Sequence, residues 1–175
     1  MLLACQTPAE KHDEPDVYYD VKGFIQNQIQ LLNQQKPVIE KTMIVGKDQE
    51  KRSTNEVNWQ QELELFVQAD INKPAYRQSY AIAQPDSLTY EYTLQTKEDL
   101  PVRYLKVVLD KPNGQPALIE AKILAENKLY ESEKNLLMRC AQKSSDWRVA
   151  SYQIKGFQEL VISSRKPFDV RVEVQ

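Results

Sequence analysis

Histidine and glycine are scarce in this sequence: one histidine and four glycines occur among 175 residues. The histidine, His12, lies in a polar N-terminal segment. A Ser–His–Asp triad, a Cys–His pair or a histidine-ligated zinc site therefore cannot form in a folded domain that follows it. The glycines lie far apart, which excludes a glycine-rich phosphate-binding loop. We expect no catalytic triad, no cofactor and no metal.

Charge of one sign and long hydrophobic runs are also lacking. Lysine and arginine number 23 against 25 aspartates and glutamates, for a net charge of −2. Nucleic-acid-binding proteins concentrate positive charge to neutralise phosphates, so nucleic acid is not an expected partner. No stretch approaches the about 20 apolar residues of a membrane-spanning helix. Any attachment to a membrane would therefore come from a lipid group.

The segment Leu2-Leu3-Ala4-Cys5 resembles the lipobox of bacterial lipoproteins, in which a small residue precedes a cysteine that becomes lipidated. Residues 6–16 are polar and contain two prolines and four acidic residues, which is typical of a solvated tether. We expect residues 1–16 to be a lipobox remnant and flexible tether, and residues 17–175 to be a single domain. The alternatives are a chance match or a disulfide between Cys5 and Cys140.

Acylation of Cys5 would place the protein on a membrane of the cell envelope. Gln6, rather than aspartate, follows the cysteine, and this favours the outer membrane, with the domain facing the periplasm or the cell exterior. The remaining cysteine, Cys140, alternates with Leu136 and Met138 in a predicted strand. We expect it to be a buried, inert thiol, because no histidine accompanies it.

Two amphipathic helices are predicted in the N-terminal half. Asp16 is the expected cap of the first, which places Val17, Phe24 and Ile29 on one stripe and stops near Lys36-Pro37. Residues 38–46 are rich in β-branched residues and predict a strand. The charged residues 47–55 predict a loop or hairpin turn. The second helix is expected to start near residue 55 or 56 and to end around residues 70–72.

From Tyr76 onward the hydrophobic period changes from 3.6 to 2, which predicts a long run of antiparallel strands. Lys111-Pro112-Asn113-Gly114 is a strong hairpin signal, and further turns are expected at residues 127–128, 143–146 and 165–167. The predicted fold is α+β, with two N-terminal helices packed on about seven or eight consecutive strands. We expect this curved antiparallel β-meander to form a half-open barrel around the helices.

Aromatic residues provide the candidate ligand site. If helices and sheet enclose a cavity, we expect an apolar or sugar ligand to contact a set of five residues: Trp59, Phe66, Tyr90, Tyr92 and Tyr104. The alternative is that these rings simply form the core. Glu131 and Glu133 would share one face of a strand, so a carboxylate-dependent glycan hydrolase is a further alternative. Two glutamates beside lysines are more typical of a solvated surface.

Three segments carry a family resemblance: residues 20–24 (DVKGF), 59–63 (WQQEL) and 70–76 (DINKPAY). In order and spacing they resemble an uncharacterised family of outer-membrane lipoproteins from Gram-negative bacteria. The resemblance implies a lipid-anchored envelope protein and supports Cys5 as the modified residue, but it brings no activity. We expect a non-enzymatic binding or scaffolding module whose partner is a lipid, a glycan or an envelope protein. The alternative is a protein–protein interaction module without a ligand cavity.

Overall fold

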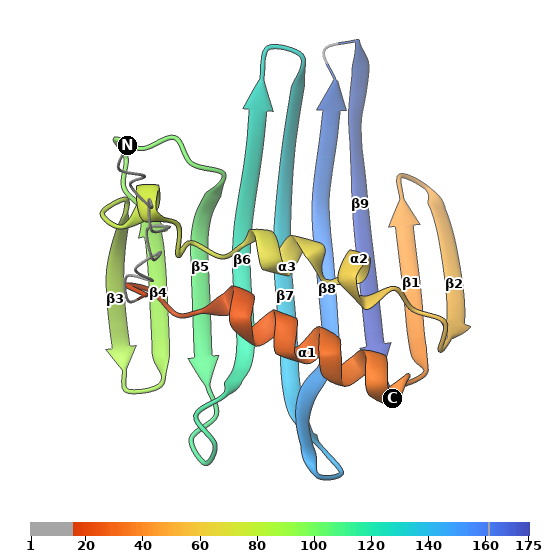
Figure 1. Ribbon diagram of the computed structural model, residues 1–175. Helices are drawn as coiled ribbons and strands as arrows, with labels where there is room; N and C mark the ends of the chain where they lie inside the picture. The colour runs from red at the N-terminus through yellow and green to blue at the C-terminus, as the bar shows by residue number, and fades with distance from the viewer. Residues whose placement is uncertain (1–15, 161) are drawn as a thin grey trace, which may run out of the picture.

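The computed structural model describes residues 16–160 and 162–175, and within them nine strands form one antiparallel sheet with the helices on one face (Figure 1). The predicted lipidation site Cys5 lies outside the described residues. The strands are β1 (Ile39–Val45), β2 (Asp48–Thr54), β3 (Tyr80–Asp86), β4 (Thr89–Leu94), β5 (Val102–Leu109), β6 (Pro116–Asn127), β7 (Tyr130–Lys143), β8 (Asp146–Leu160) and β9 (Ser163–Val174). The helices are α1 (Val21–Gln35), α2 (Trp59–Glu62) and α3 (Glu64–Gln68), followed by a 3-10 turn at Pro74–Tyr76.

The strand order is β2-β1-β9-β8-β7-β6-β5-β4-β3. Strands β3 to β9 therefore form the predicted meander, in which each strand pairs with the next along the chain. The β1–β2 hairpin joins this meander at its C-terminal strand, where Ile39 stands opposite Val174 and Val45 opposite Phe168. The α+β class and the antiparallel meander are confirmed. The sheet is not closed into a barrel, since β2 and β3 form its two edges.

Helix α1 begins later than predicted, at Val21, because Asp20 and not Asp16 is its cap. An Asp20 carboxylate oxygen accepts a hydrogen bond of 2.7 Å from the Gly23 backbone N–H, which satisfies one of the free donors of the first turn. A side chain at Gly23 would overlap that carboxylate. The helix ends at Lys36, whose φ of 46° is left-handed, and Pro37 follows as predicted.

The second predicted helix is two short helices. Asn58 caps α2 by accepting from the Gln61 N–H at 3.2 Å. Leu63, with φ −100° and ψ 5°, interrupts the helical path before α3. Its side chain is nonetheless fully buried. Because the helical path is interrupted at Leu63, α2 and α3 together follow the sheet across several strands and keep their apolar residues against the core.

Two predicted loops are strands. Residues 47–55 were expected to be a loop or hairpin turn, but residues 48–54 form the edge strand β2, paired with β1 over seven residues. Its charged, exposed side chains are typical of an edge that resists further pairing. The turn expected at Arg165–Pro167 is also wrong. These residues belong to β9, where Pro167 stands opposite Phe157, and the chain reverses between Leu160 and Ser163.

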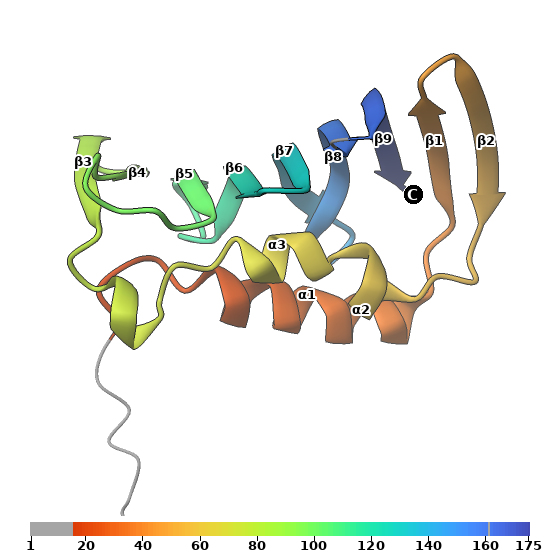
Figure 2. The same cartoon turned by 90° about the horizontal axis from the view of Figure 1, so that it is seen from above.

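The core lies between the helices and one face of the sheet (Figure 2). Aromatic rings meet edge to face within it: the ring centroids of Tyr18 and Tyr92 are 5.4 Å apart, and those of Phe66 and Tyr152 are 6.0 Å apart. Gln28 of α1 donates to the Trp147 carbonyl at 3.1 Å and accepts from the Val149 N–H at 2.9 Å. These bonds fix α1 to β8. The described helices all lie on this face of the sheet, and they leave its opposite face uncovered.

Candidate functional site

The residues predicted to line a ligand cavity do not share one surface. Trp59 of α2 and Phe66 of α3 are fully buried in the core, and Phe66 packs edge to face on Tyr152. Tyr92 is also buried, and its hydroxyl accepts a hydrogen bond of 3.0 Å from the Tyr19 N–H. Burial raises the pKa of this hydroxyl above its ordinary value. These three aromatic side chains therefore contribute to the packed core.

Tyr104 corrects the predicted set, because it points away from the other four residues. It stands opposite Thr93 on β4 and Lys122 on β6, whereas its neighbour Leu105 is buried under the helices opposite Tyr92. Adjacent residues of a strand face opposite sides of the sheet. The tyrosine hydroxyls are thus divided between the core and the open face.

Glu131 and Glu133 lie on the open face, as their spacing predicted, but both contact basic side chains. Glu131 lies 3.9 Å from Arg165 and Glu133 lies 3.0 Å from Lys122. Hydrogen bonds from Asn135 and Lys122 hold the pKa of Glu133 below its usual value. A general acid needs a raised pKa, so the electrostatics of this pair favour a solvated ion-pair surface over a glycosidase site.

Cys140 lies on the helix side of β7 together with Leu136 and Met138, and all three are buried as predicted. Burial raises the pKa of the Cys140 thiol to about 12. Within the described residues no group of three or more His, Cys, Asp or Glu side chains could hold a metal ion. The helices of the same residues include none that is long and apolar enough to cross a membrane.

Hydrogen bonds bring residues 18–22 next to residues 70–72, in or beside two of the three segments singled out in the sequence. The Asn72 amide accepts from the Tyr18 N–H at 3.0 Å and donates to the Tyr18 and Tyr19 carbonyls at 3.1 Å. The Asp70 carboxylate accepts from the Lys22 N–H at 3.3 Å. These contacts fasten the start of α1 to the chain that follows α3, so both segments have an architectural role in the fold.

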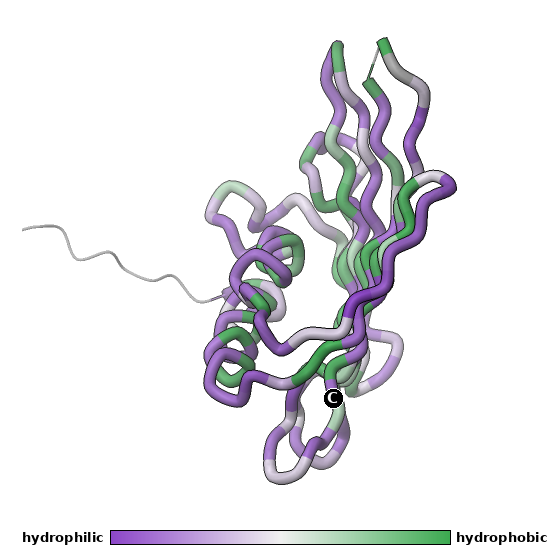
Figure 3. Tube along the Cα trace, turned by 90° about the vertical axis from the view of Figure 1, so that its right-hand side faces the viewer, coloured by the Kyte–Doolittle hydropathy of each residue, from purple (hydrophilic) through white to green (hydrophobic). Residues whose placement is uncertain are grey.

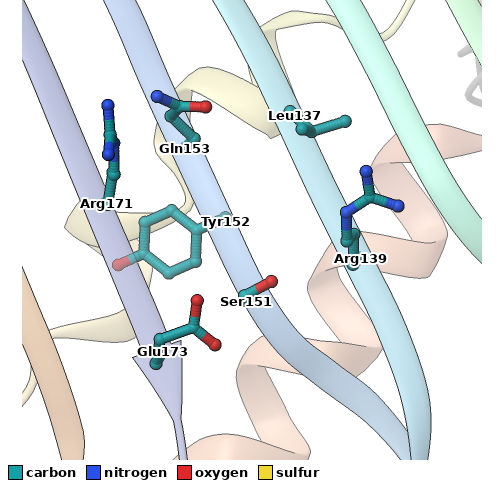
Figure 4. A pocket seen from close by; sticks show the side chains of 7 residues that line it. All are labelled: Leu137, Arg139, Ser151, Tyr152, Gln153, Arg171 and Glu173. Carbon is teal, nitrogen blue, oxygen red and sulfur yellow. The ribbon is translucent and has the colours of Figure 1, made fainter.

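The candidate functional site is a shallow groove on the open face of β7, β8 and β9 (Figure 4). Its volume is about 170 Å³, and its lining residues are Leu137, Arg139, Ser151, Tyr152, Gln153, Arg171 and Glu173. Ser151 stands opposite Arg139 on one neighbouring strand and opposite Glu173 on the other. The hollow forms because this short side chain lies between two long ones.

On the same face, next to Ser151 and Glu173, hydrogen bonds hold the side chains of Gln153, Arg171 and Asp169 in place. The Asp169 carboxylate accepts from Gln153 at 2.7 Å and from two guanidinium nitrogens of Arg171 at 3.1 and 2.5 Å. Burial raises the pKa of Asp169, but the bonds from Arg171 and Gln153 outweigh that effect and leave the pKa below its usual value. Arg139 and Glu173 make no ion pair with another described residue. They are free to contact a partner.

A partly buried polar network lies beneath the groove, on the helix side. The Tyr152 hydroxyl donates to one Glu62 carboxylate oxygen at 2.7 Å, and the Lys41 ammonium lies 2.6 Å from the other. Burial and the Glu62 charge raise the pKa of Tyr152. This network connects α2 to β1 and β8, and so supports the strands that carry the groove.

Sequence reasoning did not identify the groove residues. The alternation in residues 168–174 does place Asp169, Arg171 and Glu173 on a polar face. It does not show that Ser151 and Arg139 lie beside Glu173, because that requires the pairing register of three strands. The comparisons add no relative, since no family model, curated protein or solved structure matches the chain.

Proposed function

We propose that this protein is a non-catalytic binding module of the cell envelope, anchored to the outer membrane by acyl chains on Cys5, which binds a partner protein on the open face of its sheet. The observation that carries the proposal is the groove around Ser151, in which exposed Arg139 and Glu173 lie on either side of a short polar residue. The groove offers hydrogen bonds and two opposite charges to a partner.

The chemistry of the open face supports binding over catalysis. Its carboxylates Glu91, Glu133 and Asp169 accept charge-assisted hydrogen bonds at 2.5 to 3.0 Å from Lys106, Lys122 and Arg171. Such pairs hold side chains in place and contribute little to stability when exposed. A polar face with fixed side chains suits a partner of complementary charge, and charges at the rim of an interface mainly set specificity and association rate.

A protein partner fits better than an apolar ligand held under the helices. The aromatic side chains that would contact such a ligand, Trp59, Phe66 and Tyr92, already pack against one another or against neighbouring core residues. Arg139 and Glu173 in the groove, in contrast, are exposed to solvent. The partner surface should therefore present both an acidic and a basic side chain, to meet Arg139 and Glu173.

A photo-crosslinking experiment tests the binding proposal. A benzophenone amino acid placed at Ser151 should give one discrete adduct with an envelope protein in the native host. The same residue at Gln30, which is exposed on α1, should not. Arg139→Glu should abolish the Ser151 adduct, whereas Lys155→Glu makes the same charge change on the same face outside the groove and should leave it intact. Adducts that survive Arg139→Glu would contradict the proposed surface.

Acylation is tested separately by labelling cells with a fatty-acid analogue. The wild-type protein should incorporate the label and Cys5→Ala should not. Label retained in Cys5→Ala would show that the cysteine is not the anchor. This readout is covalent, so it does not depend on any affinity that the folded domain has for membranes.

A further inference from the structure

The β6–β7 and β8–β9 hairpins are longer than their neighbours, and their turns project beyond the other strands and beyond the helix layer (Figures 1 and 3). The two projecting turns present large apolar side chains to solvent. The exposed fractions are 71% for Leu129, 48% for Leu160 and 96% for Ile162. We call these three residues the apolar tip.

The two turns form one surface. Leu160 at the end of β8 stands opposite Tyr130 of β7, which places the second turn beside Leu129. The Asn127 side chain accepts a hydrogen bond of 2.9 Å from the Leu129 N–H, so this turn is held in a defined shape. Turns usually carry polar residues and glycine, so leucine and isoleucine at two adjacent turns require another explanation.

Some charged side chains near the apolar tip form ion pairs with each other, and others form none. Arg165 lies 3.0 Å from Glu159 and 3.9 Å from Glu131, and its guanidinium carbon lies 3.7 Å from the centre of the Phe157 ring. Lys128 and Lys166 are exposed and make no ion pair with another described residue. The basic side chains that remain available therefore flank the apolar tip, while two of the nearby carboxylates are occupied by Arg165.

We propose that the apolar tip inserts into the interfacial region of a phospholipid bilayer, with Lys128 and Lys166 at the level of the lipid phosphates. Protruding apolar side chains flanked by lysines match the bilayer interface, where acyl chains accept apolar groups and headgroups accept cations. The tip is convex, so a protein partner would need a matching cavity, whereas a fluid bilayer needs none. Exposed Glu126 lies nearby, and attraction to anionic lipid is therefore modest.

This contact goes beyond the proposed function and does not depend on acylation. With the tip in the bilayer, the long strands would stand away from the membrane surface and the open face would remain accessible from the side. The same membrane contact would limit rotation of a lipid-anchored domain. The groove around Ser151 would then be presented in a constant orientation to a partner in the envelope.

Vesicle sedimentation tests the inference with the full chain carrying Cys5→Ala, which has no acyl chain. It should sediment with vesicles of phosphatidylethanolamine and phosphatidylglycerol. The double variant Leu129→Ser, Ile162→Ser should reduce partitioning at least about tenfold, since it removes most of the apolar area that would be inserted. Ile82→Ser, at an exposed apolar residue of edge strand β3, should leave partitioning unchanged.

A second measurement reports insertion directly. Because Cys140 is buried, Ile162→Cys in the Cys5→Ala chain can be labelled selectively with an environment-sensitive fluorophore. Its emission should shift to shorter wavelength on addition of vesicles, whereas the same label on Val45→Cys, at the β1–β2 turn, should not shift. Failure of the Cys5→Ala chain to bind vesicles, equal binding by the tip variant, or an unshifted label at position 162 would each overturn the inference. None of these results bears on acylation of Cys5.

Discussion

The Tyr152 hydroxyl donates a 2.7 Å hydrogen bond to the Glu62 carboxylate and thereby connects β8, at the floor of the groove, to α2 on the other side of the sheet. The second oxygen of Glu62 accepts from Lys41. A half-buried carboxylate is thus satisfied from two directions, which limits the cost of removing it from water.

Tyr152→Phe removes one partner of Glu62 and should lower the free energy of unfolding by about 1 to 2 kcal/mol, because a hydrogen bond to a charged group is lost. Urea denaturation followed by circular dichroism measures the change. Tyr90→Phe is the matched control, since Tyr90 is a half-buried tyrosine with no hydrogen bond from its hydroxyl to another described residue. Equal effects of the two substitutions would show that the network is not stabilising.

Asn72→Ala should destabilise the fold by about 2 to 3 kcal/mol, because Tyr18 and Tyr19 lose three hydrogen bonds with Asn72 in a partly buried region. Hydrogen exchange of the first turn of α1 should increase at the same time, since these bonds hold the chain that enters the helix. Asn55→Ala, at an exposed asparagine, is the control. A stable Asn72→Ala protein with unchanged exchange would contradict this role.

Gly156→Ala should destabilise the protein by about 1 to 3 kcal/mol. A methyl group at this position would overlap the Glu133 carbonyl oxygen on β7, so β7 and β8 would have to separate locally. Thermal unfolding measures the effect, and Lys155→Ala, at the exposed neighbouring residue, should change the melting temperature little. Tolerance of Gly156→Ala would show that the hairpins accommodate a wider spacing at no cost.

Stability should fall in acid partly through Glu133. Its folded-state pKa is lowered by hydrogen bonds from Asn135 and Lys122, so its contribution is present above the unfolded pKa and disappears as pH falls through the folded pKa. Because the pair is partly exposed, Glu133→Gln should cost only about 0.5 kcal/mol at pH 7. It should also flatten the acid limb of the stability profile. An acid limb identical to the wild type would exclude a role for this carboxylate.

Cys140 should be unreactive in the native protein. Burial raises the pKa of its thiol to about 12, so little thiolate forms at pH 8 and reagents reach it poorly. In the Cys5→Ala chain, Ellman's reagent should label Cys140 only after unfolding in guanidinium chloride. The unfolded thiol ionises at lower pH than the folded one, so this residue's stabilising contribution should decline as pH rises above the unfolded pKa. Rapid native labelling would indicate local opening of β7.

Local sequence patterns determined much of the secondary structure. Alternation from Leu88 to Leu94 and from Phe168 to Val174 predicted strands, and Asn113-Gly114 marked a turn that forms, with Gly114 at φ 67°. These signals depend on side-chain period and on residues that tolerate positive φ, which are properties of neighbouring residues. The first helix was predicted for the same reason, although its cap was expected at Asp16 and is Asp20.

Tertiary structure alone decided which strands became neighbours and therefore where the groove and the apolar tip lie. Ser151, Arg139 and Glu173 come from three strands, and their juxtaposition follows from pairing register, including the shift between Arg139 and Cys140. Tyr104 was placed on the wrong face although it directly precedes Leu105, which is buried, and adjacent residues of a strand face opposite sides of the sheet. A one-residue change of register reverses every side chain of a strand. Only burial of the whole apolar face against the helices selects one register over the other.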